Sequence, residues 1–160
     1  MAKANIENLL EIQDLSISFR MLEASNEVVK GVSLRIPPGK TVALVGESGS
    51  GKSVISQAIM GLLPRNGAIT GGRITFRDPR DPAEPIEIAS FDRNGPEMQK
   101  LRGGRIGMIF QEPMSSLSPV HRIGDQIGEA LQLHKPVPKA EVRQACLLYT
   151  SDAADDSLRV

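Results

Sequence analysis

Hydrophobic and polar residues alternate near the start of the chain. Toward the end of the segment 9–19, apolar side chains occupy every second position and serines lie between them, which is the period of a strand with one exposed face. A second apolar pattern covers residues 28–36 and ends at the turn-forming sequence Pro37-Pro38-Gly39. The two patterns predict strands of an antiparallel sheet edge, joined by a turn at residues 23–27.

Two further apolar runs lack this alternation. Residues 41–45 are almost continuously apolar, and residues 105–113 contain a second run that ends in polar side chains. Unbroken apolar character is typical of parallel strands that are buried on both faces. We expect these segments to be core strands of an open α/β sheet, in which ligands bind beyond the carboxyl ends of the strands.

Helical spacing follows each of these runs. After residue 53, apolar side chains recur at three- and four-residue intervals until Pro64. The same spacing at residues 122–134 predicts an amphipathic helix that ends before Pro136, and another helix is expected to begin at Lys139.

Shorter elements are expected between the two core runs. Residues 71–76 predict a short strand, and residues 86–88 predict a strand that pairs back with it. Met98 and Leu101 predict a brief helix that ends at two glycines.

The segment between the first core run and the first helix is rich in glycine: Gly46-Glu47-Ser48-Gly49-Ser50-Gly51-Lys52-Ser53. Its glycines let successive main-chain amides point inward and bind phosphate oxygens at a helix N-terminus. Lys52 supplies a positive charge for the β- and γ-phosphates, and the Ser53 hydroxyl can bind Mg²⁺. An ordinary glycine-rich turn is the alternative, but the order strand, loop, helix favours a nucleotide phosphate site.

Two other positions have more than one interpretation. Phe19, at the end of the first strand, could stack on a nucleotide base, although a lone aromatic is also a common core residue. Gln111 and Glu112 end the second core run, and Glu112 as a general base would indicate a small self-contained NTPase or kinase. The neutral amide of Gln111, a weak Mg²⁺ ligand, and Pro113 favour instead a loop that leaves the site.

The composition narrows the class of protein. The 160 residues contain 19 basic and 19 acidic side chains, so no net charge attracts nucleic acid or anionic lipid. No apolar run has the roughly 20 residues that a membrane-spanning helix needs. We therefore expect a cytoplasmic protein with no nucleic-acid partner. His121 and His134 lack partners at metal-ligand spacing, so we expect exposed or capping roles for them.

Two motifs are specific enough to indicate a family. The first is the glycine-rich loop with Val54, and the second is Ile109-Phe110-Gln111-Glu112-Pro113-Met114-Ser115-Ser116-Leu117-Ser118-Pro119-Val120, followed by Ile123-Gly124-Asp125-Gln126-Ile127. Together they resemble the ATP-binding subunits of ABC transporters, and among these the subunits of dipeptide and oligopeptide importers. The resemblance covers nearly all of residues 9–145. Ser115 and Ser118 stand where that branch usually has Thr and Asn, which leaves the transported solute open.

The resemblance implies an α/β fold and a role for each site residue. The fold is the P-loop NTPase core of an ABC nucleotide-binding domain, with an antiparallel β edge and the start of the helical subdomain, and residues 1–145 are its N-terminal half. Phe19 stacks on adenine, and Ser53 and Gln111 hold Mg²⁺. Gln111 also positions the attacking water, and Glu112 is a loop residue. The residues that bind the triphosphate of ATP are Gly46, Ser48, Gly49, Ser50, Gly51, Lys52 and Ser53.

The resemblance also implies a function and partners. ATP hydrolysis by the full-length parent energises import of peptides or similar small solutes. The partners are two membrane-spanning permease subunits, a second nucleotide-binding subunit and, indirectly, a solute-binding protein, with the protein peripheral on the inner face of the cell membrane. A soluble P-loop ATPase that acts on nucleic acid or protein is the alternative.

The family's later motifs are absent from this sequence. They are the Leu-Ser-Gly-Gly signature, the strand with the Mg²⁺ aspartate and the catalytic glutamate, and the switch histidine. We therefore expect the 160-residue chain not to hydrolyse ATP by itself. A chain that lacks core strands can also fail to fold, which a urea titration would reveal.

Residues 146–160 differ in character from the rest of the chain. The segment from Cys146 to Asp156 can be back-translated into a string that resembles the transposase adaptor used to prepare sequencing libraries. The hypothesis is that the native reading frame was lost near Ala145. A natural polar terminus is the alternative.

Overall fold

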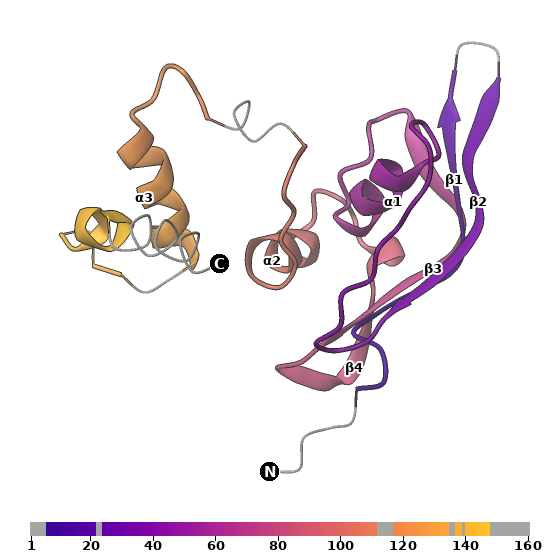
Figure 1. Ribbon diagram of the computed structural model, residues 1–160, viewed down its shortest axis with the longest axis horizontal. Helices are drawn as coiled ribbons and strands as arrows, with labels where there is room; N and C mark the ends of the chain where they lie inside the picture. The colour runs from indigo at the N-terminus through magenta and orange to yellow at the C-terminus, as the bar shows by residue number, and fades with distance from the viewer. Residues whose placement is uncertain (1–5, 22–23, 112–116, 135–136, 139, 148–160) are drawn as a thin grey trace. The chain divides into compact units, whose positions relative to one another are not determined.

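The computed structural model describes residues 6–21, 24–111, 117–134, 137–138 and 140–147. The chain divides into two compact units, Met1–Ile106 and Gly107–Val160, and each is described by itself. Figure 1 shows the order of the elements along the chain. No helix in the described ranges combines the length and the apolar character needed to cross a membrane.

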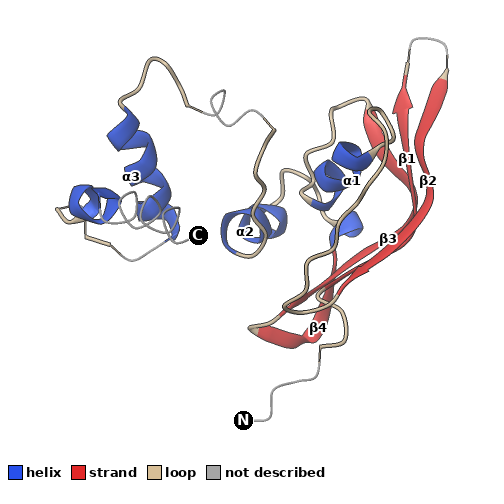
Figure 2. Ribbon diagram, viewed as in Figure 1, coloured by secondary structure: helices blue, strands red, loops and turns tan. Residues whose placement is uncertain are grey.

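A four-stranded antiparallel sheet is the framework of the first unit (Figure 2). The predicted alternation is confirmed, because Leu15 and Ile17 are fully buried on the face that forms the core. The predicted strands at 28–36 and 71–76 are confirmed and are longer than predicted, since each begins earlier in the sequence. In the order in which they lie across the sheet, the strands are β2 (Ser25–Ile36), β1 (Leu10–Arg20), β3 (Gly67–Asp78) and β4 (Asp81–Glu87).

A β-bulge interrupts the alternation of β1 at Asp14. This residue has φ of 48°, and the pairing register of β1 with β2 shifts between Ile12 and Leu15. The Asp14 amide donates a hydrogen bond to Ser33 Oγ over 2.9 Å, and the Ser33 hydroxyl donates to Asp14 Oδ1 over 3.2 Å. On the other side of the bulge lies Gly72, with φ of 84°. The extra residue explains why Ile12 and Leu15, three positions apart, face the same core.

Helices cover one face of this sheet (Figure 2). The helix predicted after residue 53 is α1 (Lys52–Ile59), and the brief helix around Met98 is α2 (Pro96–Gly104), so both predictions are confirmed. A 3-10 turn, η1 (Ile88–Ser90), precedes α2. The helices contribute four buried side chains to the same core cluster as the strands: Ile55, Ala58, Met98 and Leu101.

The first predicted core strand is wrong. Residues 41–45 do not form a strand, and the exposed fractions of Val42, Leu44 and Val45 are 44%, 45% and 89%. A parallel strand needs neighbours whose main-chain groups complete its hydrogen bonds. In the part of the chain that the structure describes, the four strands pair antiparallel with one another, and none of them pairs with residues 41–45.

The second predicted core strand is also wrong over its described part. Residues 106–110 form no strand, and Ile109 and Phe110 have exposed fractions of 93% and 51%. Glu112 and Pro113, which complete the predicted run, lie outside the described residues. The physical reason is the same, because no described strand pairs with this segment.

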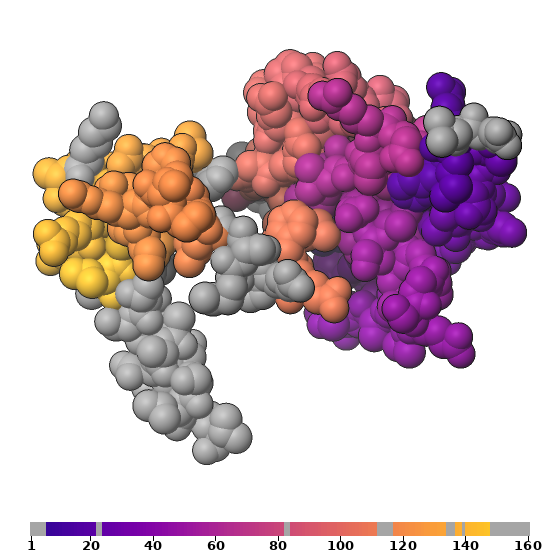
Figure 3. Space-filling model, turned by 90° about the horizontal axis from the view of Figure 1, so that it is seen from above, coloured from indigo at the N-terminus to yellow at the C-terminus, as the bar shows by residue number. Residues whose placement is uncertain are grey.

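The second unit contains two helices in its described part. Helix α3 (Ile123–His134) confirms the predicted amphipathic helix, and residues 142–147 form the helix expected after Lys139. The two helices approach closely at Gly128, where a Cβ atom would lie 2.9 Å from Cγ1 of Val142. Figure 3 shows α3 (orange) and the yellow segment that includes 142–147 as adjoining masses.

Candidate nucleotide-binding site

The glycine-rich loop connects β2 to α1 and has the conformation that its glycines allow. Gly49 and Gly51 have φ of 81° and 91°, in the left-handed region that side chains disfavour. A Cβ atom on Gly46 would lie 2.7 Å from Oγ of Ser50, so the loop closes tightly at this point. The Ser50 amide donates to the Glu47 carbonyl over 3.3 Å, which completes a turn. The loop is therefore folded back toward its own start.

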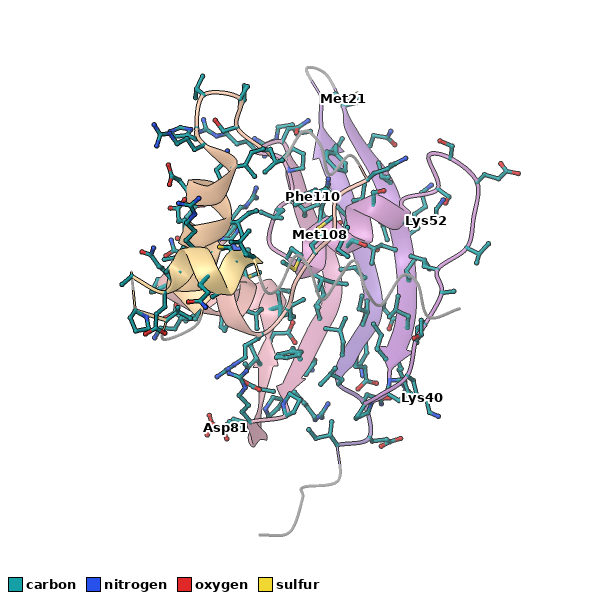
Figure 4. The ribbon with its side chains drawn as sticks, turned by 60° about the vertical axis from the view of Figure 1, so that its left-hand side comes forward. Met21, Lys40, Lys52, Asp81, Met108 and Phe110 are labelled. Atoms are coloured by element: carbon teal, nitrogen blue, oxygen red, sulfur yellow. The ribbon has the colours of Figure 1, made fainter. Side chains whose placement is uncertain are left out.

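Lys52 lies at the centre of this loop (Figure 4). Its Nζ atom donates hydrogen bonds to the carbonyl oxygens of Gly46 and Glu47, over 2.7 and 2.5 Å, and to Ser50 Oγ over 3.1 Å. The sequence places a cation beside the loop, and the structure shows the loop wrapped around that cation. The arrangement thus holds a positive charge inside the loop, where an anion could exchange with the carbonyl oxygens.

The beginning of α1 adds to the positive character of the site. Gly51 is the N-cap residue and provides no side-chain acceptor, and the first turn has no acidic residue. The first amide groups of a helix have no partner within the helix, and its dipole concentrates partial positive charge there. The only described acceptor for an early amide is the Gly51 carbonyl, which bonds to the amide of Ile55 over 3.0 Å. Amides at this helix end therefore suit phosphate oxygens.

The sheet fixes the position of this helix end. A Cβ atom on Gly51 would lie 3.2 Å from Cγ2 of Val29, so the N-cap rests directly on β2. Val29 pairs with Ile17 on the neighbouring strand, and Phe19 follows two residues later on the same face of β1. Two residues span about 7 Å along a strand. The N-cap of α1 and Phe19 are thus attached to the same part of the sheet, although Phe19 and Val45, the residue before the loop, are 26 positions apart.

Phe19 is half-buried and packs against the core cluster. It pairs with Gly67 on β3, and its ring lies over that glycine: a Cβ atom on Gly67 would be 2.8 Å from Cε1 of Phe19 and 3.3 Å from Cδ1. The core packing expected for a lone aromatic is therefore present, and its stacking on adenine stays a prediction. The structure brings this side chain to the same region as the loop.

The remaining predicted residues have less defined surroundings. Ser48 and Ser53 are exposed, as a hydroxyl that binds a ligand must be. Gln111 is exposed and belongs to the second unit, so its position relative to Lys52 is not described. Among the residues that the structure describes, no group of three or more His, Cys, Asp or Glu side chains could hold a metal ion. Magnesium at a nucleotide site commonly takes few protein ligands and is completed by phosphate and water.

Sequence reasoning missed the role of Gln126. The amphipathic pattern of 122–134 gave this polar residue no specific contact, whereas its side chain binds the preceding loop by three hydrogen bonds. Gln126 Oε1 accepts from the Ser118 amide over 2.8 Å, and Nε2 donates to the carbonyls of Ser118 and His121 over 3.0 Å each. Ser118 Oγ and His121 Nδ1 are 2.9 Å apart and hydrogen-bonded. The eight-residue spacing between Ser118 and Gln126 gave no signal of this contact.

Comparison with known proteins gives a family match and close relatives. The model of the ABC transporter family matches residues 29–158. A putative peptide import ATP-binding protein of Brucella abortus is 44% identical over 140 residues, which are 87% of this chain and 40% of that protein. The dipeptide transport ATP-binding protein DppD of Bacillus subtilis is 43% identical over 91% of this chain and 41% of its own length. The chain thus spans about 40% of the length of these relatives.

Solved structures share the fold. A dimeric ATP-binding cassette in a post-hydrolysis state, bound to ADP and Pi, superposes with a TM-score of 0.68 at 24% identity, over 86% of this chain and 54% of that chain. A bacterial ABC transporter cassette gives a TM-score of 0.66 over 84% of this chain and 53% of its own. The mixed α/β fold with an antiparallel sheet is therefore that of ABC cassettes. With the family match covering most of its length, the chain belongs to the ABC transporter family.

Proposed function

We propose that the loop from Gly46 to Ser53 binds the triphosphate of ATP. The observation that supports this most directly is the position of Lys52, whose ammonium group contacts two loop carbonyls beside the uncapped end of α1. When ATP binds, Lys52 exchanges at least one carbonyl contact for a phosphate oxygen, which is a stronger charge-assisted acceptor. Main-chain amides of the loop then hold the phosphates, and Ser48 and Ser50 lie within the same loop.

The other predicted residues complete the site in this proposal. Phe19 stacks on the adenine, while Ser53 and Gln111 donate oxygen atoms to Mg²⁺. Magnesium, when bound, neutralises charge on the β- and γ-phosphates. Gln111 also orients the attacking water in the full-length protein, and the loop after Gln111 contacts a permease subunit. Glu112 has no part in proton transfer.

We propose that the full-length protein hydrolyses ATP to energise the import of peptides or similar small solutes. The support is the printed function of its relatives, which are import or transport ATP-binding proteins for peptides, dipeptides and oligopeptides. The proposed partners are two membrane-spanning permease subunits and a second nucleotide-binding subunit, with a solute-binding protein acting indirectly. The proposed place is the inner face of the cell membrane.

Equilibrium dialysis with labelled ATP and millimolar Mg²⁺ tests the binding step in the full-length protein. We expect saturable binding that a tenfold excess of unlabelled ATP displaces. Absence of binding would refute the site, and with it the assignment to transport. Co-purification with permease subunits from membranes would support transport, whereas a soluble protein that co-purifies only with nucleic acid or another soluble protein would support a non-transport ATPase.

We further propose that residues 1–145 are the N-terminal half of a nucleotide-binding domain and that residues 146–160 derive from an adaptor. The 160-residue chain is then unable to hydrolyse ATP. Turnover by the purified chain that disappears in Lys52→Ala would refute this proposal. The family match extends to residue 158, into the same segment, so the origin of these codons must be tested directly. Sequencing the source DNA with a library method that uses no transposase adaptor decides between an adaptor and a native terminus.

A further inference from the structure

The contact between Phe19 and Gly67 has a consequence for nucleotide recognition. The aromatic ring lies over the α-carbon of Gly67, with no room for a methyl group, since a Cβ atom there would be 2.8 Å from Cε1 and 3.3 Å from both Cδ1 and Cζ. Gly67 is not in the left-handed region, so the requirement for glycine at this position comes from the ring and not from the main chain. The ring is half-buried, so part of it remains accessible.

The main chain of Gly67 is held on both sides. Its amide donates to the Pro64 carbonyl over 2.9 Å, and its carbonyl accepts from Arg93 Nη2 over 3.1 Å. Nη1 of Arg93 donates to the carbonyls of Leu63 and Pro64, over 3.1 Å each. One guanidinium group thus joins the segment after α1 to the first residue of β3. This network fixes the surface on which the Phe19 ring rests.

We propose that Gly67, held by Arg93, is a positioning residue that sets the plane of the Phe19 ring for stacking on the base of ATP. This inference rests on the proposed function of Phe19. Gly67 does not touch the nucleotide. It determines how far the ring lies from the sheet, and therefore whether the ring meets the base while the loop holds the phosphates. Stacking is short-ranged, and a gap of 0.5–1 Å removes about a quarter to a half of a contact's attraction.

The test separates recognition of the base from recognition of the phosphates. The affinities of Mg²⁺-ATP and Mg²⁺-tripolyphosphate are measured by calorimetry for the full-length protein and its variants, because tripolyphosphate has no base. Gly67→Ala should weaken ATP binding by about two- to fivefold and leave tripolyphosphate binding unchanged, as expected for partial loss of an aromatic–base stack. The matched control is Gly71→Ala on the same strand, where a Cβ atom would make an ordinary contact of 3.7 Å with Cβ of Ser16. Gly71→Ala should change neither affinity.

A second comparison distinguishes this inference from the proposed function. Phe19→Ala should weaken ATP binding alone, and adding Gly67→Ala to that variant should have no further effect. If Phe19→Ala leaves ATP binding unchanged, the stacking function itself is refuted. If Phe19→Ala weakens ATP binding and a folded Gly67→Ala does not, the positioning role of Gly67 is refuted. Equal loss of ATP and tripolyphosphate binding in Gly67→Ala would also overturn it.

Should Gly67→Ala not fold, Arg93→Lys decides: a reduced ratio of ATP to tripolyphosphate affinity supports the inference, and an unchanged ratio overturns it.

Discussion

The Nζ atom of Lys52 lies 2.7 Å from the carbonyl oxygen of Gly46, so the first residue of α1 is joined to the first residue of the glycine-rich loop. This contact closes the loop on itself. A Cβ atom at Gly46 would lie 2.7 Å from Oγ of Ser50, another contact of Lys52 Nζ. The ammonium group of Lys52 is therefore held in place by the main chain of the loop.

Removing the ammonium group should therefore weaken ATP binding strongly. In Lys52→Ala we expect at least about a tenfold loss of affinity, because hydrogen bonds to charged groups contribute about 1.5–3 kcal/mol. Equilibrium dialysis of the full-length protein measures this loss. Lys40→Ala is the control, since it removes the same charge at an exposed position near the other end of the sheet (Figure 4). Equal losses in the two variants would indicate a nonspecific effect of charge.

The bulge in β1 predicts that substitution of Gly72 strongly destabilises the folded protein. In Gly72→Ala the new Cβ atom would lie 2.4 Å from the carbonyl oxygen of Gln13, and the main chain has φ of 84°. We expect the free energy of unfolding to fall by about 2 kcal/mol or more, because both strain and overpacking act there. Urea denaturation followed by circular dichroism measures the change.

The neighbouring glycine is the control for that experiment. Gly71→Ala introduces a methyl group at ordinary contact distance on the same strand and should change the free energy of unfolding much less. If the two variants are equally stable, Gly72 does not lie as close to the main chain of Gln13 as the structure indicates.

Gln126 should hold the segment from Ser118 to His121 in a single conformation. Gln126→Ala removes the acceptor of the Ser118 amide and the donor to two carbonyls. We expect hydrogen exchange at Ser118 to accelerate at least about tenfold, because each bond contributes about 1 kcal/mol net and three are lost together. Gln132→Ala, at an exposed position of the same helix, should leave exchange at Ser118 unchanged. Identical exchange at Ser118 in both variants would show that the three hydrogen bonds of Gln126 do not hold this segment.

The sheet also has a pH-dependent contact on its exposed side. A hydrogen bond from Gln13 and the nearby guanidinium of Arg35, which lies 2.9 Å from Oε1, lower the pKa of Glu11 below its ordinary value. Because the folded-state pKa is the lower one, the stabilisation is present above the unfolded-state pKa and is lost as the pH falls through the folded-state pKa. A carbon-detected NMR titration should show Glu11 titrating at lower pH in the native state than in urea. Arg35→Gln should raise that midpoint, and an unchanged midpoint would contradict the contribution of Arg35.

The sequence predicted the elements whose signals are local. Strand β1 and helix α3 follow from the spacing of their apolar residues, and the tight conformation of the loop from Gly46 to Ser53 follows from its glycines. The apolar runs at 41–45 and 106–110 show the limit of such signals. Continuous apolar character indicates a segment suited to burial, but it does not say which other segment provides the hydrogen bonds and the covering surface.

Contacts distant in sequence left no pattern to interpret. Gly67 follows Pro64-Arg65-Asn66 and resembles an ordinary turn residue, and only its pairing with Phe19, 48 positions earlier, reveals its role. Arg93 lies in a polar connection whose charge has many possible uses. The bulge at Asp14 was hidden for the same reason, because a shift of register depends on the partner strands and their glycines.

The exposure of Val45 and Ile109, at 89% and 93%, has a practical consequence for anyone handling this chain. Each lies in an apolar stretch that belongs to no described strand, so its side chain is exposed to another molecule. Such stretches add readily to the strands of a second copy and promote aggregation. Concentrated solutions of the 160-residue chain should therefore precipitate on warming, and a charged substitution at either residue should delay precipitation more than the same substitution at buried Ile17 would.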